Sequence, residues 1–298
     1  MDKIGFIGLG IMGLPMALNL KRAGYDIYAC ARKPERLQLL LAQGATACAT
    51  PARVAESSDV IIIMVSDTPD VEQVVLGDDG VVAGARAGSV VVDMSTISPS
   101  VSRQIASRLE QAGVDMLDAP VSGGEKGAIE GTLSIMVGGN AAVLERTRPV
   151  FEVLGSKIVH IGDHGAGQVA KACNQLIIAQ TVAAIGEAFM LAKANEVDPF
   201  RVREALLGGF AASRVLENHG QRMLTDNFGA GFKARLHQKD LRIALESAAE
   251  LGIAIPGAAA AAKLLDEVAR RGMGEEDSIA IYRLQQELNV KNSGPEKS

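Results

Sequence analysis

A short apolar segment near the start of the chain runs directly into three glycines spaced as Gly-x-Gly-x-x-Gly. Residues 3–7 have the pattern of a buried strand, Gly8, Gly10 and Gly13 form the motif, and residues 12–23 have the pattern of a helix. In this context the glycines permit a tight turn, a close approach of the backbone to a diphosphate, and close packing of helix on strand. The motif therefore predicts a strand–turn–helix unit of a parallel sheet.

The same turn is a candidate site for a dinucleotide. Its free N–H groups and the positive end of the helix dipole would hold the diphosphate. A glycine-rich turn without a ligand is the alternative, but the strand before the motif and the helix after it favour the nucleotide. The residues expected at the diphosphate are Gly8, Leu9, Gly10, Ile11, Met12 and Gly13.

Short β-branched runs alternate with helical patterns from residue 3 to about residue 161. This alternation is typical of a doubly wound, mostly parallel sheet whose crossovers are helices. The further runs are residues 26–31, 60–65, 89–94, 115–117, 134–137 and 158–160, and residues 34–43 form a second predicted helix.

The alternation stops after Gly167, and long helical patterns follow. Residues 168–195 contain no proline and only Gly186, so they predict one helix of roughly 28 residues, about 42 Å long. The other helices are expected at residues 199–207, 214–225, 238–251, 256–271 and 278–289. We therefore expect an α/β domain over residues 1–163 and an all-helical domain over residues 164–298, begun by the long helix.

Charge and composition narrow the class of partner. The net charge of −5 and pI near 5.5 give no general attraction to nucleic acid or anionic membranes, so neither partner is expected. The three cysteines form no Cys-x-x-Cys pair, and no signal-peptide pattern precedes the glycine motif, which together favour the cytoplasm. His160 and His164 flank a Gly-Asp turn without an evident third ligand, so no metal site is predicted.

The end of the second strand bears on the choice of dinucleotide. An acid is usual there when the ribose 2′-hydroxyl is bound, but this chain has Ala31-Arg32-Lys33. Two cations without a carboxylate favour the 2′-phosphate of NADP(H), with Arg32 as its partner, and NAD(H) stays possible. The alternative is that Arg32 and Lys33 are ordinary solvated charges.

Residues after later strands are candidates for the nicotinamide half, because ligands bind beyond the carboxyl ends of parallel strands. These are Val65, Ser66 and Thr96. A Ser-Thr pair before Ser98-Pro99 could equally be a helix cap, and the sequence leaves that choice open.

Two further segments carry candidate chemistry. Ser122-Gly123-Gly124 follows a strand, and its free N–H groups and hydroxyl suit a small carboxylate. Lys171 and Asn174 lie three residues apart on one face of the long predicted helix. The neighbours of Lys171 are apolar, which favours a buried proton donor over an exposed helix lysine.

With these motifs in order along the chain, the sequence clearly resembles the β-hydroxyacid dehydrogenase family, which includes 3-hydroxyisobutyrate and 6-phosphogluconate dehydrogenases. The resemblance covers essentially the whole length: residues 5–13, the Ser122 turn, the Lys171 helix, and Lys239-Asp240-Leu241. It implies a Rossmann domain followed by an all-α domain, with the active site in the cleft between them. Assembly as a dimer or tetramer through the helical domain is also implied.

The family's site residues carry over onto matching positions. Lys171 takes the place of the catalytic lysine, Ser122, Gly123 and Gly124 that of the carboxylate-binding turn, and Asn174 that of the substrate-orienting amide, with Gln175 beside it. Thr96 and Lys239 match positions that contact the cofactor.

The resemblance also implies a substrate class. Residues 123–139 and Ala172-Cys173-Asn174-Gln175 look like the branch that reduces tartronate semialdehyde (2-hydroxy-3-oxopropionate) to D-glycerate. Oxidation of 3-hydroxyisobutyrate and reduction of another short semialdehyde are alternatives. A nicotinamide-binding sensor without turnover is a further alternative, although a sensor would not need Lys171.

Overall fold

The computed structural model describes residues 3–292 and divides the chain into two compact units. The first ends at Lys171 and the second starts at Ala172, so the division falls inside one long helix. The expected domain boundary at residues 163 and 164 lies just before this helix and stays a prediction.

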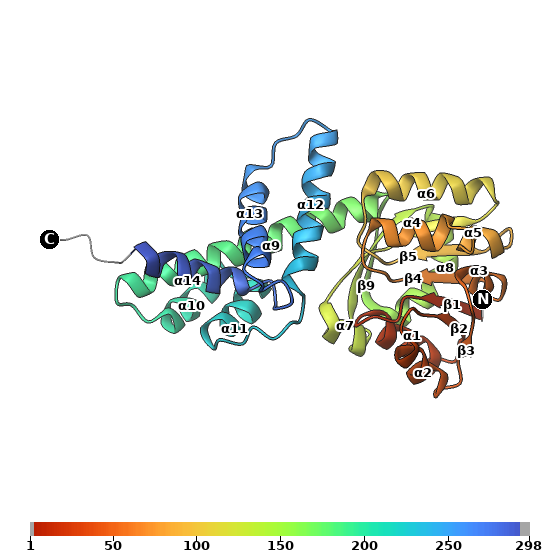
Figure 1. The fold of residues 1–298 in the computed structure, drawn as a ribbon, viewed down its shortest axis with the longest axis horizontal. Coiled ribbons are helices and arrows are strands. Elements are labelled where there is room, and N and C mark those ends of the chain that lie inside the picture. The colour runs from red at the N-terminus through yellow and green to blue at the C-terminus, as the bar shows by residue number, and fades with distance from the viewer. Residues whose placement is uncertain (1–2, 293–298) are drawn as a thin grey trace. The chain divides into compact units, whose positions relative to one another are not determined.

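The first unit is built on a single sheet, whose spatial order is β3-β2-β1-β4-β5-β6-β8-β7, with β9 paired to β8 (Figure 1). All neighbours from β3 to β6 in this order are parallel, whereas β8 is antiparallel to both β6 and β7. The strands are β1 (Lys3–Ile7), β2 (Asp26–Cys30), β3 (Thr46–Ala47), β4 (Val60–Ile63), β5 (Val90–Asp93), β6 (Asp115–Asp118), β7 (Val121–Ser122), β8 (Leu133–Gly139) and β9 (Gly155–Gly162).

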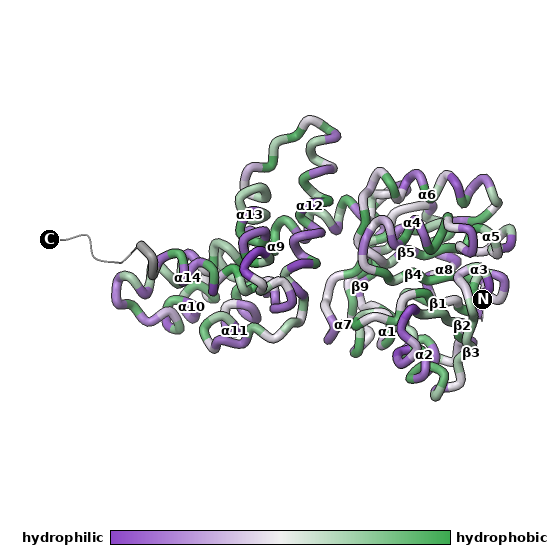
Figure 2. The backbone as a smooth tube through the Cα atoms, in the orientation of Figure 1, coloured by the Kyte–Doolittle hydropathy of each residue, from purple (hydrophilic) through white to green (hydrophobic). Residues whose placement is uncertain are grey.

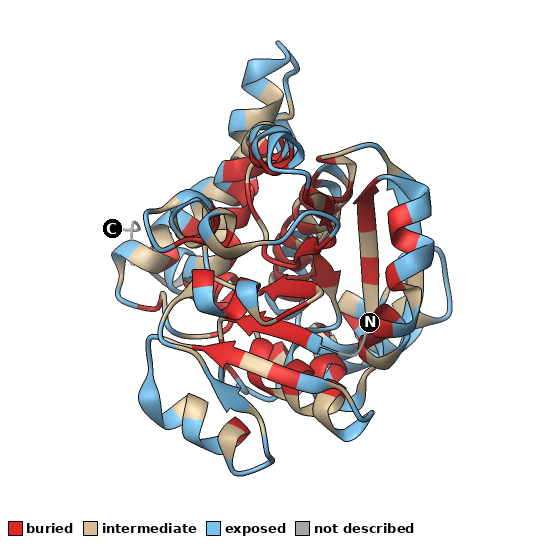
Figure 3. Ribbon diagram, turned by 90° about the vertical axis from the view of Figure 1, so that its right-hand side faces the viewer, coloured by how far each residue is buried: buried red, intermediate tan, exposed pale blue. Residues whose placement is uncertain are grey.

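Helices cover both faces of this sheet because successive strand residues point to opposite sides. Phe6 belongs to one buried cluster and Ile7 to the other. The first face holds α1 (Gly13–Arg22), α2 (Pro34–Leu41), α7 (Gly124–Glu130) and α8 (Ala141–Leu154); the second holds α3 (Pro51–Glu56), α4 (Thr68–Leu76), α5 (Val81–Gly84) and α6 (Pro99–Gln111). The strands are mostly buried, and the outer faces of the helices are exposed (Figure 3).

The second unit is entirely helical. It contains the greater part of α9 (Ala166–Ala194), followed by α10 (Pro199–Leu207), the π-helix η1 (Val215–Gly220), α11 (Gln221–Leu224), α12 (Ala234–Glu250), α13 (Pro256–Arg270) and α14 (Ala280–Asn292). Its core includes Phe189 and Tyr282, whose rings meet edge to face at 6.1 Å. A Cβ at Gly186 would lie 1.9 Å from Gln285 Oε1, so this glycine lets α14 pack close to α9.

The mostly parallel sheet and the following helical region confirm the predicted fold class. The sequence patterns missed β3, β7 and α7, and they did not reveal that β8 runs antiparallel to β6. The helix expected over residues 214–225 begins as a π-helix, where Arg203 donates hydrogen bonds to the carbonyl oxygens of Leu216 and Glu217.

Helix α9 has the length and apolar composition of a membrane-spanning helix (Figure 2). Its apolar residues nevertheless belong to a protein core, since Ala179, Val182 and Phe189 are fully buried among the helices of the second unit. A core helix of this kind passes the same test of length and composition.

Candidate functional site

The three glycines of the turn between β1 and α1 differ in whether the fold itself requires them. A Cβ at Gly8, where φ is +99°, would lie 2.2 Å from the carbonyl oxygen of Met64, and one at Gly13 would lie 1.9 Å from that of Gly8. Both glycines are therefore required by the backbone itself. Gly10 is exposed, and a Cβ there would meet no atom of the described residues within 4 Å.

The N-terminus of α1 is arranged to receive an anion. Within residues 3–292, the N-cap residue Met12 makes no side-chain capping hydrogen bond, and the first turn carries no acid. The N–H of Leu14 donates to the carbonyl oxygen of Gly10 at 3.1 Å and Pro15 has no N–H, so the first turn of α1 attracts an anion mainly through the helix dipole. With open space at Gly10, this turn fits the diphosphate of a dinucleotide.

The chain segments that follow β4 and β5 meet beside this turn. The N–H of Val65 donates to Ser95 Oγ at 3.0 Å, and the N–H of Ser95 donates to Asp93 Oδ1 at 3.0 Å. Ser66 is exposed and Thr96 is half-buried. The cap of α6 is Ser98, which accepts from the N–H of Val101, so the capping role considered for Thr96 belongs to another residue.

Arg32, at the end of β2, is exposed and forms an ion pair with Asp70. The distance from Arg32 Nη1 to Asp70 Oδ1 is 3.2 Å. The sequence showed no carboxylate beside Arg32 because Asp70 belongs to α4, which follows a different strand. The expectation that no carboxylate lies beside Arg32 is therefore corrected by the structure.

The Ser122 turn joins β7 to α7. Ser122 is paired with Ser134 of β8, and the next two residues have positive φ angles, +141° at Gly123 and +63° at Gly124. Such angles favour glycine, and glycine turns of this kind can bind an anion through their backbone N–H groups. Both glycines are exposed.

Lys171 lies in the second turn of α9, and its side chain is only 7% exposed. The first turn of this helix is anchored to the carboxyl end of the sheet. Asp118, the last residue of β6, accepts hydrogen bonds from the N–H groups of Gly165 at 2.7 Å and Gln168 at 3.0 Å. The side chain of Gln168 accepts from the N–H of Ile97 and donates to the carbonyl of Ser95.

Asp118 and Gln168 were not predicted as site residues. Asp118 directly follows the predicted strand at residues 115–117 and Gln168 begins the long predicted helix, but only the fold shows that they connect α9 to the ends of β5 and β6. Burial raises the pKa of Asp118 above its ordinary value, and the hydrogen bonds from Gly165 and Gln168 oppose that rise. In the sequence, the one sign of a role for Asp118 was its carboxylate directly after a predicted buried strand.

Asn174 and Gln175 belong to a polar network inside the second unit. Asn174 Nδ2 donates to Gln175 Oε1 at 2.8 Å, and Gln175 Nε2 donates to Asp240 Oδ2. Lys239 Nζ lies 2.9 Å from Asp240 Oδ1, and His237 Nε2 is 3.0 Å from the carbonyl oxygen of Gln175. His237 and Asp240, both buried, were missed because their partners lie more than 60 residues away in the chain.

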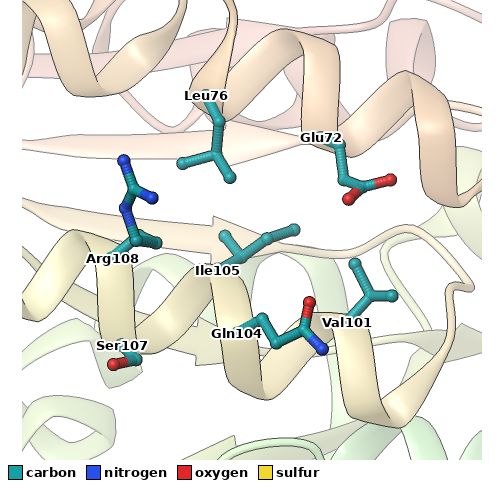
Figure 4. A pocket seen from close by; sticks show the side chains of 7 residues that line it. All are labelled: Glu72, Leu76, Val101, Gln104, Ile105, Ser107 and Arg108. Atoms are coloured by element: carbon teal, nitrogen blue, oxygen red, sulfur yellow. The ribbon is translucent and has the colours of Figure 1, made fainter.

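A separate groove of about 370 Å³ lies on the first unit between α4 and α6 (Figure 4). Its lining residues are Glu72, Leu76, Val101, Gln104, Ile105, Ser107 and Arg108. None of these belongs to the expected site. We therefore do not assign the reduction to this groove.

Two known domain families match successive parts of the chain. Residues 3–162 match the domain family described as the NAD binding domain of 6-phosphogluconate dehydrogenase. Residues 165–285 match the family described as the NAD-binding domain of NADP-dependent 3-hydroxyisobutyrate dehydrogenase.

Individual relatives match along nearly the whole chain. The 2-hydroxy-3-oxopropionate reductase of Escherichia coli (strain K12) is 49% identical over 281 residues, covering 94% of this chain and 96% of the relative. The 3-hydroxyisobutyrate dehydrogenase of Pseudomonas aeruginosa is 38% identical, covering 89% and 91%. The structure of Mycobacterium tuberculosis 3-hydroxyisobutyrate dehydrogenase with L-serine superimposes with a TM-score of 0.89 at 32% identity, covering 96% and 99%.

Proposed function

Because this chain belongs to the β-hydroxyacid dehydrogenase family, we propose that it reduces tartronate semialdehyde to D-glycerate, reversibly, with a nicotinamide dinucleotide. The family assignment makes the protein an oxidoreductase that acts on CH–OH groups. The choice of substrate rests on the 49% identity with the E. coli 2-hydroxy-3-oxopropionate reductase.

One structural observation carries the chemical part of the proposal. Lys171 is buried on a helix whose first turn is hydrogen-bonded, through Asp118 and Gln168, to the carboxyl ends of β5 and β6. Ligands of parallel sheets bind beyond this edge. A buried lysine on a helix fixed to that edge suits proton transfer better than a solvated surface lysine would.

The cofactor proposal uses the residues of the first unit. The turn from Gly8 to Gly13 and the start of α1 would hold the diphosphate, and Val65, Ser66 and Thr96 would lie toward the nicotinamide half, with Lys239 as a further contact. Arg32 favours NADP(H), and NAD(H) stays the alternative. When bound, the dihydronicotinamide supplies a hydride to the aldehyde carbon.

The chain's own groups complete the reduction. As the carbonyl bond opens and negative charge develops on the aldehyde oxygen, Lys171 Nζ donates a proton to that oxygen, which leaves an alcohol and a neutral amine. Ser122, Gly123 and Gly124 would bind the substrate carboxylate, and Asn174, with its amide oriented by Gln175, would orient the substrate. Oxidation reverses these steps.

The remaining expectations rest on the net charge and cysteine content of the chain and, for the oligomer, on the family. The substrate is a small molecule rather than a nucleic acid or a membrane lipid, the enzyme acts in the cytoplasm, and the chain assembles into a homo-oligomer, either a dimer or a tetramer. A sensor without turnover is disfavoured by the anchored, buried lysine.

A second substrate is supported by specific relatives. The 38% identity with a 3-hydroxyisobutyrate dehydrogenase and the likeness to a solved enzyme of that name make 3-hydroxyisobutyrate the main competitor. In 3-hydroxyisobutyrate, one carbon likewise separates the carboxylate from the carbon that bears the alcohol. The Ser122 turn and Lys171 could therefore serve this substrate as well.

The test is a steady-state comparison of kcat/KM. Purified protein is assayed with NADPH and NADH against tartronate, methylmalonate and succinic semialdehydes. In the reverse direction it is assayed with NADP⁺ and NAD⁺ against D-glycerate and 3-hydroxyisobutyrate. The proposal predicts the highest value for tartronate semialdehyde. A higher value for any other substrate of the panel would replace our choice.

A further inference from the structure

The ion pair between Arg32 and Asp70 joins two segments that leave the sheet on either side of β1. Arg32 follows β2, Asp70 lies in the first turn of α4 after β4, and β1 is the strand between β2 and β4. Neighbouring strands are about 4.8 Å apart, so β2 and β4 are separated by roughly 10 Å. The pair therefore reaches across the strand that ends in the glycine turn.

The two partners differ in how firmly they are held. The Arg32 side chain is 81% exposed, whereas that of Asp70 is 29% exposed. Asp70 also lies in the first turn of α4, where the helix dipole favours a carboxylate. Asp70 is thus the more fixed partner, and Arg32 is the side chain able to move to another anion.

We infer that Asp70 is a specificity-determining residue, which disfavours NADP(H) relative to NAD(H) by occupying Arg32. This inference rests on the proposed function. A 2′-phosphate would need the Arg32 guanidinium as its partner and would have to displace the Asp70 carboxylate from it. NAD(H) carries a 2′-hydroxyl instead of the phosphate and does not need the Arg32 guanidinium, so the ion pair can stay intact when NAD(H) binds.

The competition has a defined size. Both partners are accessible to solvent, so the pair is screened by water and salt, and exposed ion pairs are weak. Removing the Asp70 charge should therefore improve the use of NADPH by about 2- to 5-fold at low ionic strength. The use of NADH should change by less than about 2-fold.

The first experiment compares Asp70→Asn with Glu72→Gln in the full-length protein. Glu72 is a matched control because it removes one acidic charge from the same helix but points into the groove between α4 and α6 (Figure 4). The expected result is a higher ratio of kcat/KM for NADPH over NADH in Asp70→Asn and an unchanged ratio in Glu72→Gln. Equal changes in the two variants would overturn the inference, because they would show a general charge effect.

The second experiment tests whether Asp70 acts through Arg32. Arg32→Ala should raise the KM for NADPH much more than that for NADH. In the Arg32→Ala background, Asp70→Asn should no longer improve the use of NADPH, since there is no guanidinium left to release. A gain of the same size with and without Arg32 would contradict the proposed competition.

A binding measurement separates this inference from the proposed function. Calorimetry with NADPH and NADH, and with their fragments adenosine 2′,5′-bisphosphate and AMP, needs no turnover. Asp70→Asn should tighten only NADPH and the bisphosphate, with the gain shrinking as salt is added. If neither dinucleotide binds the wild-type protein, the proposed function fails and the inference with it. If both bind but Asp70→Asn leaves their relative affinities unchanged, the inference fails and the proposed function stands.

Discussion

The two units fix their candidate site residues by different physical means. In the first unit, the glycine turn is set by backbone contacts that leave no room for a Cβ at Gly8 or Gly13. In the second, Asn174 is placed by a network of buried side chains that passes through Gln175 to Asp240. A motif of small residues can be seen in a sequence, whereas a network of partners distant in the chain becomes visible only in the fold.

Asp277 is another buried residue of the second unit whose partners are distant in the chain. Its fully buried carboxylate accepts hydrogen bonds from the N–H groups of Gly231 at 2.9 Å and Phe232 at 3.0 Å, and from Arg222 Nη1 at 3.1 Å. It thereby holds the segment between α11 and α12 against the start of α14. The Asp277 side chain adds to backbone hydrogen bonds between the same segments, such as that from the N–H of Ser278 to the carbonyl oxygen of Phe232 at 2.9 Å.

Removing this carboxylate should have the largest effect on stability. Asp277→Ala leaves the N–H groups of Gly231, Phe232 and Ile279 without their acceptor and removes one acceptor of Arg222, so we expect a loss of about 3–5 kcal/mol in the free energy of unfolding. Urea unfolding followed by circular dichroism would measure it. A loss below about 1 kcal/mol would show that the second unit does not depend on buried acceptors as we describe.

A glycine pair tests the first unit in the same way. Gly13→Ala would force a Cβ into the carbonyl oxygen of Gly8, which should cost about 3 kcal/mol and abolish dinucleotide binding. Gly10→Ala is the control, because its Cβ meets open space within the described residues: stability should stay within about 0.5 kcal/mol.

The control variant also has a binding readout. If Gly10 is needed for the diphosphate, Gly10→Ala should weaken the binding of NADPH and NADH alike, as measured by fluorescence titration. Full affinity in Gly10→Ala would mean that the dinucleotide does not approach this turn.

Asp118→Asn should lower the free energy of unfolding by less than Asp277→Ala or Gly13→Ala does. The amide keeps one acceptor oxygen but cannot accept both N–H bonds from Gly165 and Gln168, so we expect a loss of about 1–3 kcal/mol. Because burial raises the pKa of Asp118 in the folded state, the folded protein binds this proton more tightly than the unfolded chain does. The stability contributed by this group is present at low pH and is lost as pH rises through the raised pKa.

The variant should therefore also flatten the pH dependence of unfolding in that window. Denaturation of the wild-type protein and Asp118→Asn at a series of acidic pH values would show this. Parallel curves for the two proteins would remove Asp118 as the source of the dependence.

Much of the fold could be predicted because the local patterns agree with the final structure. The strands at residues 3–7 and 26–31 and the helix at residues 199–207 lie where the patterns predicted them. What local pattern could not show is long-range pairing: strand β8 runs antiparallel to β6 because of a connection through β7 and α7, both too short to be recognised.

The candidate site divides in the same way. Gly8, Gly10 and Gly13 could be predicted because their spacing has a physical meaning in a single strand–turn–helix unit. Asp70 could not, since its relation to Arg32 depends on the order of β2, β1 and β4 in the sheet. The roles of Ser122, Asn174 and Lys239 stay predictions from the family resemblance.

The most direct test concerns Lys171 as the proton donor. Wild-type protein and Lys171→Ala are each loaded with NADPH and mixed with tartronate semialdehyde, and a single turnover is followed by the absorbance of the dihydronicotinamide. We predict equal affinity for NADPH and a rate of reduction about 10² to 10⁴ lower in the variant. A rate within about 2-fold of the wild-type value would show that the lysine has no part in the chemistry.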